Sequence, residues 1–224
     1  MDDVIHVISL HVCAGSMKNY SYIVYKNHER KAIVIDPAWE FVKYLDIFKE
    51  YDLEPGAILL THLHHDHINL TDLFLERYSI DLWAAVPAQN ALKTVPNARF
   101  FQHKETLVLC DLPCTTYITP GHTPESSCFL IGDHFFTGDT LFIEGCGMCF
   151  GDSGDPKALY KSIQFLKDTL SPEIKIYPGH RYVEYPGIAY KEVLKKNIYL
   201  HIENEDTFIR FRMRPGQTQL FNFK

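Results

Sequence analysis

The chain has no apolar run that approaches the length of about 18 residues needed for a membrane-spanning helix. The N-terminal residues 1–7 carry acidic side chains where a secretory signal peptide would carry basic ones. We therefore expect a cytoplasmic protein without a membrane partner. No linker is evident either, so residues 1–224 are expected to form a single domain.

An excess of basic residues is also missing. The 22 Lys and Arg residues are outnumbered by 28 Asp and Glu residues, and the formal net charge is −6. The phosphates of a nucleic acid call for a basic protein surface, so no nucleic-acid partner is expected.

The six cysteines do not make a disulfide framework in a cytosolic chain of this size. Cys146 and Cys149 have the spacing of a redox pair or of half a zinc knuckle. No second pair at knuckle spacing accompanies them, because Cys110 and Cys114 are too far apart in sequence. We interpret Cys146 and Cys149 as free thiols.

Histidine, by contrast, is concentrated in one segment. Residues 61–67 read Thr-His-Leu-His-His-Asp-His and directly follow an apolar run at 57–60. Neutral imidazoles are the commonest zinc ligands and a carboxylate adds a hard oxygen, so the segment can bind two adjacent divalent cations. If the segment is extended, His62 and His64 point the same way and Asp66 continues that face. The alternative is a surface turn that binds metal weakly.

Three further segments argue against a weak surface site. Each follows a short apolar, β-branched or aromatic run and places one candidate ligand on a glycine turn. The segments are 119–124, 136–140 and 177–180, and their candidate ligands are His122, Asp139 and His180.

The order of these residues resembles that of the metallo-β-lactamase fold superfamily, specifically its glyoxalase II branch. The resemblance extends from Asp36-Pro37 to Gly179-His180, and all seven ligand positions are filled. It implies an α/β protein with a four-layer αββα sandwich and a cofactor of two Zn²⁺ per chain, with Fe or Mn as alternatives. By this resemblance, one metal is bound by His62, His64 and His122, the other by Asp66, His67 and His180, and Asp139 bridges both.

Such a ligand set implies a metal-dependent hydrolase of ester or thioester bonds. A water between two divalent cations loses a proton near neutral pH, and the cations polarise a carbonyl group. Asp66 is then the catalytic carboxylate that orients the nucleophile. A thiolate leaving group has a pKa of about 8 to 9 and needs no general acid, and the motifs contain no obvious candidate for one.

The glyoxalase II likeness suggests a thioester, but the residues that would bind glutathione differ. Met148-Cys149-Phe150 stands where that family carries a basic residue and a tyrosine, whereas Tyr182 matches a substrate-contacting tyrosine. The chain also ends before the helical C-terminal domain that completes the glutathione site in relatives. We therefore expect a different acyl thioester.

Over nearly its whole length the chain is similar to the zinc-dependent hydrolases of bacterial trans-acyltransferase polyketide clusters, the bacillaene type in particular. The similarity rests on chain length and on segments 19–25 and 177–182. It implies a role in antibiotic biosynthesis and an acyl substrate on the phosphopantetheine arm of an acyl carrier protein.

Lactone and β-lactam hydrolysis stay open as variants of the hydrolase, and three further alternatives remain. A hydroxyacylglutathione hydrolase of the glyoxalase II type uses the same ligands. A persulfide dioxygenase resembles the same motifs but binds one iron through two histidines and the bridging aspartate. A non-enzymatic binding protein is disfavoured because no ligand position has been lost.

Hydrophobic periodicity predicts strands at 4–10, 20–25, 31–35 and 174–177, helices at 39–51, near 70–78 and at 156–170, and a β-rich stretch at 106–137.

Near the C-terminus, Arg210, Arg212 and Arg214 alternate with apolar residues, so an extended conformation would put them on one face. We favour an edge strand with a solvated basic face. The alternative is a surface that attracts a carrier protein or the phosphate of its arm. Its further members would be Arg181, Lys195 and Lys196.

Overall fold

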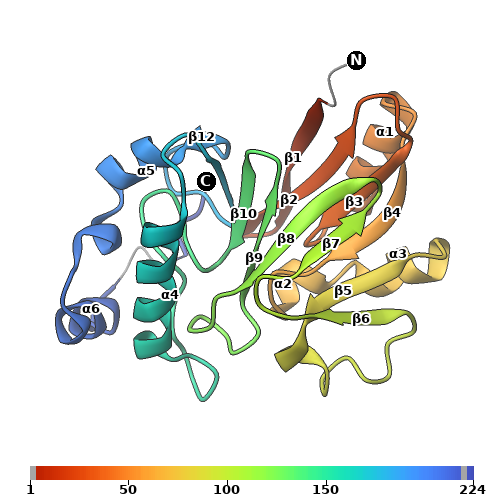
Figure 1. Ribbon diagram of the computed structural model, residues 1–224. Coiled ribbons are helices and arrows are strands. Elements are labelled where there is room, and N and C mark those ends of the chain that lie inside the picture. The colour runs from red at the N-terminus through yellow and green to blue at the C-terminus, as the bar shows by residue number, and fades with distance from the viewer. Residues whose placement is uncertain (1–3, 218–220) are drawn as a thin grey trace.

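The computed structural model describes residues 4–217 and 221–224. Two six-stranded sheets lie face to face, and helices cover the outer face of each sheet (Figure 1). The predicted four-layer αββα sandwich is thereby confirmed. Within the described ranges, no helix has the length and apolar character that crossing a membrane requires.

The first sheet has the strand order β1-β2-β3-β4-β5-β6. Its first three strands pair antiparallel, and the pairs from β3 to β6 are parallel. Helices α1 and α3 pack on its outer face through Tyr44, Phe48 and Phe74. The elements of this half are β1 (Ile5–Ala14), β2 (Met17–Lys26), β3 (Lys31–Ile35), α1 (Phe41–Glu50), β4 (Glu54–Leu59), α2 (His65–Ile68), α3 (Thr71–Arg77), β5 (Asp81–Ala85), η1 (Val86–Ala88) and β6 (Ala98–Phe101).

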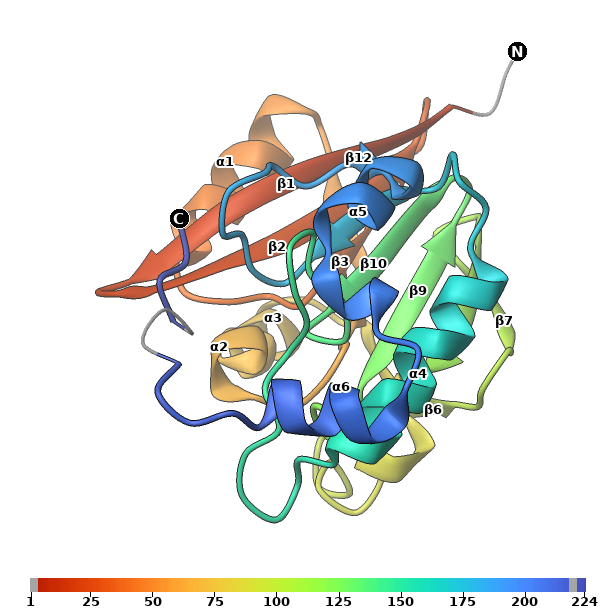
Figure 2. The same ribbon diagram turned by 90° about the vertical axis from the view of Figure 1, so that its left-hand side faces the viewer.

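The second sheet has the order β12-β11-β10-β9-β8-β7, and β10 and β11 pair in parallel while its other pairs are antiparallel. Figure 2 shows α4, α5 and α6 in front of this sheet. The elements are β7 (Thr106–Leu109), β8 (Leu112–Ile118), β9 (Ser127–Ile131), β10 (His134–Gly138), α4 (Pro156–Thr169), β11 (Lys175–Pro178), β12 (Ile188–Ala189), α5 (Tyr190–Lys196), η2 (Ile198–His201) and α6 (Glu205–Arg212).

The central strands of the first sheet are buried on both faces. In β2, Tyr22 and Val24 pack into the core between the sheets, whereas Ile23 packs against α1 and α3. In β3, Ile33 faces the second sheet and Val34 faces the helices. A strand covered on both sides needs apolar residues at every position, which explains why these segments read as continuous apolar runs.

The strands and helices predicted from periodicity are present, with boundaries shifted by a few residues. Helix α1 begins at Phe41 rather than Trp39, because Trp39 has a φ of 62° and its backbone N–H donates to Asn69 Oδ1 at 2.8 Å. The strands β5 and β6 and the helix α5 were not predicted. Their apolar runs are short, and tertiary packing decides such segments.

The extended conformation predicted around Arg210, Arg212 and Arg214 is wrong, because residues 205–212 form helix α6. Asn204 caps this helix by accepting from the backbone N–H of Thr207 at 2.9 Å, and acidic residues in its first turn favour a helix. Residues two apart on a helix diverge, so Arg210 faces solvent while Arg212 is buried. The proposed basic face therefore does not exist.

Candidate metal centre

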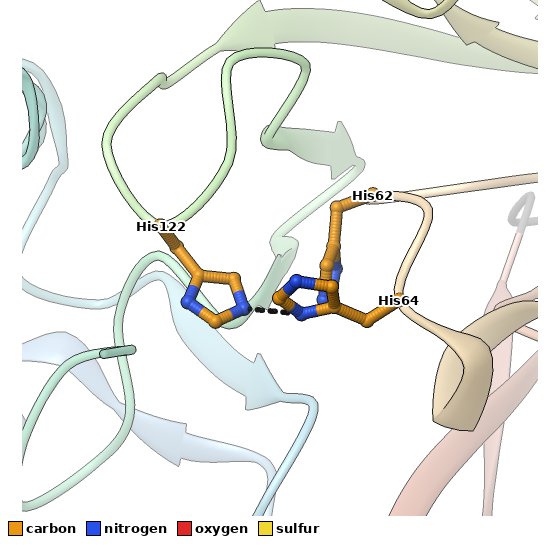
Figure 3. Close-up of side chains that lie close together, drawn as sticks. All are labelled: His62, His64 and His122. Carbon is orange, nitrogen blue, oxygen red and sulfur yellow. Dashed lines mark hydrogen bonds between the residues drawn. The ribbon is translucent and has the colours of Figure 1, made fainter. Parts of the chain in front are cut away.

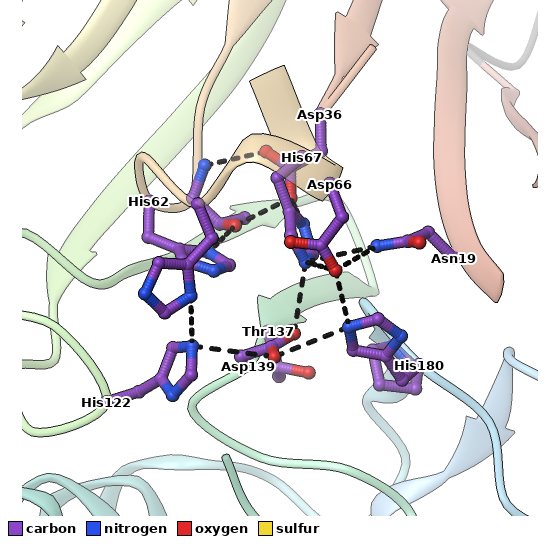
Figure 4. Close-up of polar contacts among 12 residues, drawn as sticks. Asn19, Asp36, His62, Asp66, His67, His122, Thr137, Asp139 and His180 are labelled. Carbon is purple, nitrogen blue, oxygen red and sulfur yellow. Dashed lines mark hydrogen bonds and ion pairs between the residues drawn. The ribbon is translucent and has the colours of Figure 1, made fainter. Parts of the chain in front are cut away.

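The seven candidate ligands meet at one edge of the sandwich. They lie in four segments, which follow the strands β4, β8, β10 and β11. Two of the ligands lie on the short helix α2, which comes after β4. Figure 4 shows their side chains converging from both sheets. In three groups the potential ligand atoms lie within 4.8 Å of one another, and these groups are His62, His64 and His122; Asp66, His67 and His180; and Asp36, His62 and His67. The first two correspond to the predicted metal sites, and in the third Asp36 is already engaged by hydrogen bonds from Thr61 and His67.

The first group consists of three imidazoles (Figure 3). Their ring centroids are 4.5 to 4.9 Å apart, and His64 Nδ1 lies 2.9 Å from His122 Nε2. His62 is buried, whereas His64 is exposed at the mouth of the site. As the alternation of an extended segment predicted, His62 and His64 face the same point. The helix α2 begins directly after them, at His65.

Asp139 lies between the two groups. Its Oδ2 is 3.5 Å from both His122 Nε2 and His180 Nε2, and its Oδ1 is 3.4 Å from His67 Nε2. Asp66 Oδ2 lies 3.4 Å from His180 Nε2. A single carboxylate thus contacts ligands of both groups. Gly179 allows this approach, because a Cβ there would lie 2.5 Å from Asp139 Oδ1.

The orientation of two of the imidazoles is set by Asp36. Its carboxylate accepts from the Thr61 backbone N–H at 2.8 Å, from the Thr61 hydroxyl at 2.6 Å and from His67 Nδ1 at 2.9 Å. Because the Thr61 hydroxyl donates its proton to Asp36, its oxygen accepts from His62 Nδ1 at 3.0 Å. His62 and His67 therefore turn Nε2 into the site.

Two further imidazoles are oriented by backbone carbonyls. His122 Nδ1 donates to the carbonyl of Met148 at 2.6 Å, and His180 Nδ1 donates to the carbonyl of Lys18 at 2.7 Å. Their Nε2 atoms consequently face the site. A hydrogen bond on the far nitrogen is the usual way in which a protein fixes the tautomer of a histidine that binds metal.

The charge states of the site follow from burial and from the close packing of acids and imidazoles. Burial, together with His67 and His122, lowers the pKa of His62 well below its ordinary value. Burial opposes ionisation of Asp66 and Asp139, but the neighbouring His180 and His67 hold the pKa of each carboxyl well below its usual range. Both carboxylates are thus ionised at neutral pH.

His67 behaves differently from His62. Burial by itself lowers the pKa of His67, but the carboxylates of Asp139 and Asp36 raise it well above the ordinary value. His67 is therefore protonated in the metal-free protein, and a metal ion has to displace that proton. Metal binding at this position is expected to be coupled to proton release.

Two buried polar atoms at the centre have no hydrogen-bond partner within the described part of the chain, namely His62 Nε2 and Asp139 Oδ1. Leaving a buried acceptor unpaired costs about 1–3 kcal/mol. An imidazole nitrogen with its lone pair free and a carboxylate oxygen are both zinc ligands. The residues present therefore fit a divalent metal.

Asn19 and Asp36 support the site, although the sequence pattern predicted a chemical role for neither. Asn19 Nδ2 donates to Asp66 Oδ2 at 2.9 Å, and Asn19 Oδ1 accepts from Trp39 Nε1 at 3.0 Å. Asp36 adopts a φ of 51°, a strained value for a residue with a side chain. The only signal in the sequence was that both positions lie in segments resembling those of known families.

A pocket of about 520 Å³, open to solvent, lies over the candidate ligands. Tyr182, predicted to contact substrate, lines it, and burial raises the pKa of this phenol well above its ordinary value, so the hydroxyl stays neutral.

Cys146 and Cys149 are free, as predicted. Burial raises the pKa of Cys146 to about 11 and that of Cys149 to about 12, which keeps both thiols protonated.

Residues 15–180 match the Metallo-beta-lactamase superfamily, and the chain belongs to this family. The probable polyketide biosynthesis zinc-dependent hydrolase BaeB of Bacillus velezensis is 36% identical over 225 residues, covering 100% of both chains. PksB of Bacillus subtilis, which carries the same description, is 34% identical over 207 residues, 92% of each chain.

The branch of the family that includes glyoxalase II is also represented among the relatives. A hydroxyacylglutathione hydrolase of Wigglesworthia glossinidia brevipalpis is 32% identical over 166 residues, which are 73% of this chain and 62% of the relative. The crystal structure of ETHE1 from Myxococcus xanthus aligns with a TM-score of 0.82 and 27% identity, covering 96% of this chain and 95% of that one. The resemblances inferred from the sequence are confirmed.

Asp36→Asn is expected to weaken Zn²⁺ binding by about 10- to 100-fold, the usual effect of losing a residue that orients a metal ligand. An amide cannot accept the three hydrogen bonds that Asp36 receives from Thr61 and His67. Zn²⁺ affinity can be measured by competition with a chromophoric chelator. Asp72→Asn is the matched control, because Asp72 is exposed in the first turn of α3. Equal affinities in the two variants would show that Asp36 does not orient the ligands.

Proposed function

We propose that residues 1–224 act as one domain, a dinuclear zinc-dependent hydrolase that cleaves an acyl thioester in polyketide antibiotic biosynthesis. The observation that carries this proposal is the set of oriented ligand atoms, with His62 Nε2 and Asp139 Oδ1, buried without a hydrogen-bond partner in the described part of the chain, at its centre. Full-length similarity to BaeB and PksB supports zinc and the biosynthetic role. Fe or Mn are the alternative metals.

The residues divide into two metal sites in this proposal. His62, His64 and His122 would hold one ion, Asp66, His67 and His180 would hold the other, and Asp139 would bind both. A pair of bound zinc ions supplies Lewis acidity and an activated water, whose pKa falls to about 7 on a catalytic zinc.

Asp66 is the proposed catalytic carboxylate. The Asn19 amide holds Asp66 Oδ2 by a hydrogen bond of 2.9 Å, and the carboxylate is ionised, so it can accept a hydrogen bond from the attacking water and aim it at the thioester carbonyl. Water adds to the carbonyl carbon and the C–S bond breaks, so the products are a carboxylate and a thiol. One proton of the water neutralises the leaving thiolate and the other is released to solvent when the acid ionises. Tyr182, a neutral phenol in the pocket wall, is the proposed substrate contact.

The pocket disfavours glutathione as the thiol half of the substrate. Glutathione carries two carboxylates, which need cationic partners. The pocket has no Lys or Arg among its described lining residues, and Met148 and Phe150 occupy its wall. We therefore propose a thioester on the phosphopantetheine arm of an acyl carrier protein, over the glyoxalase II-type alternative.

A mononuclear-iron persulfide dioxygenase is the other alternative. It needs only one set of ligands, whereas the second group, Asp66, His67 and His180, is as closely assembled as the first. Because a persulfide dioxygenase resembles the same motifs, the second group does not separate the two functions, and we favour the hydrolase on the similarity to BaeB over the whole chain.

Metal content separates these two functions. The purified protein is expected to contain two metal ions per chain, measured by inductively coupled plasma mass spectrometry, and Asp139→Ala is expected to lose both, because this carboxylate contacts both groups. Asp133→Ala is the control, since Asp133 is an exposed carboxylate in an ion pair with Lys175. One iron per chain in the wild type would support the dioxygenase, and two metals retained in Asp139→Ala would contradict the bridging role.

Asp66→Asn is expected to lower kcat for thioester hydrolysis by roughly 100-fold or more while the fold is kept, the scale of losing a positioned catalytic group. The amide is neutral and a poorer hydrogen-bond acceptor for water. Turnover and circular dichroism should be measured on the same preparation, with metal content determined alongside. Turnover near the wild-type rate would remove Asp66 from the mechanism.

The thioester assignment is tested by a panel with one acyl group on glutathione, coenzyme A and an acyl carrier protein, together with a lactone. We expect kcat/KM to be highest for the carrier-bound thioester and lowest for the glutathione thioester, because the pocket lacks cationic partners for glutathione. Faster cleavage of the glutathione thioester would favour the glyoxalase II-type alternative. Cleavage of the lactone alone would overturn the thioester assignment.

A further inference from the structure

One wall of the pocket is formed by the C-terminal residues 221–224. Phe221 and Phe223 line the pocket, although they are more than forty positions beyond the last candidate ligand, His180. Phe223 stacks on the His180 ring with centroids 3.9 Å apart and an interplanar angle of 13°. The backbone N–H of Lys224 donates to the carbonyl of Arg181 at 2.9 Å, which ties this segment to the loop after β11.

Apart from the candidate ligands and Tyr182, the described lining of the pocket is entirely apolar. It consists of Met17, Phe142, Met148, Phe150, Phe221 and Phe223. Phe142 and Phe223 form its deeper part and are almost fully buried, with ring centroids 6.2 Å apart. An anionic group entering this space would lose its hydration and would find no Lys or Arg among the described lining residues.

The outer part of the pocket presents aromatic surface to solvent. Phe150 is 54% exposed and Phe221 is 60% exposed, and their rings are stacked with centroids 6.2 Å apart at 20°. Two large exposed aromatic rings beside a pocket are a feature of binding sites, because apolar surface of this kind is stabilised when a ligand covers it. Core packing does not account for this pair, since more than half of each ring is exposed to water.

We propose that these four phenylalanines form an acyl-binding subsite that selects uncharged, apolar acyl chains, with Phe221 and Phe223 as residues that determine specificity. This inference rests on the proposed thioester hydrolase function. The carbonyl has to reach the candidate metal ligands, so the acyl chain attached to it lies against the adjoining apolar wall. The pantetheine arm fits this wall poorly, because its two amides need hydrogen-bond partners that the phenylalanines and methionines do not offer.

The magnitude of the selectivity follows from apolar burial. Each methylene transferred from water into an apolar site favours binding by about fourfold. Lengthening the acyl chain from acetyl to hexanoyl adds several such groups, so kcat/KM is expected to rise by about tenfold or more. A succinyl group has the carbon count of a butyryl group but ends in a carboxylate, and it should react at least about tenfold more slowly.

The test uses N-acetylcysteamine thioesters, in which the leaving group is constant and only the acyl group changes. We expect Phe221→Ala to reduce the hexanoyl-to-acetyl ratio of kcat/KM by about fivefold. Phe221→Arg should raise the rate for succinyl relative to butyryl, because it places a cation at the pocket mouth. Tyr51→Ala is the matched control, since Tyr51 is an aromatic residue 45% exposed outside the pocket, and neither ratio should change.

Binding of S-hexyl-N-acetylcysteamine, a thioether that cannot be hydrolysed, gives a readout independent of turnover. Its dissociation constant, measured by isothermal titration calorimetry, should be about fivefold higher for Phe221→Ala than for the wild type and unchanged for Tyr51→Ala. Equal rates for butyryl and succinyl thioesters, with thioether binding unaffected by Phe221→Ala, would overturn the subsite and leave the hydrolase function standing. If no thioester is cleaved while the thioether binding depends on Phe221, the proposed reaction fails and the apolar subsite is supported.

Discussion

The structure depends on one arrangement: four imidazoles are each held by a hydrogen bond at Nδ1, so that their Nε2 atoms converge. Asp36, through Thr61 for one ring and directly for another, orients His62 and His67, and two backbone carbonyls orient His122 and His180. Packing unpaired acceptors and carboxylates together costs free energy when no cation is present. The side chains nevertheless keep this arrangement, because the surrounding sandwich restrains the backbone segments that carry them.

The two sheets supply that restraint. The backbone N–H of Tyr20 in β2 donates to the carbonyl of Gly179 at 2.8 Å, and the Tyr22 hydroxyl donates to the carbonyl of Pro178 at the end of β11. These bonds connect one sheet to the other directly beside His180. The apolar core between the sheets fixes their separation, so ligands carried by different sheets keep their distance from one another.

The three aspartates of the centre illustrate how environment separates the roles of identical side chains. Asp36 is fully engaged by hydrogen bonds and acts only as a support. Asp139 lies between the two ligand groups and its two oxygens face imidazoles of both, and Asp66 reaches the pocket with one oxygen held by Asn19. The pocket wall beside them is apolar, and its Phe223 stacks on the His180 ring without adding charge to the site.

The sequence by itself determined the candidate ligands and the fold class. All seven ligands lie in short segments where the residue types, the preceding apolar run and the turn residues are all local, and local patterns can be recognised without coordinates. Tertiary structure alone decided the roles of Asn19, Asp36 and Phe221, because each acts on a partner far away in sequence. It also decided that residues 205–212 form a helix. The apolar residues of this segment fit the alternation of a strand as well as the spacing of a helix. Packing against α4 and the cap at Asn204 favour the helix over the strand.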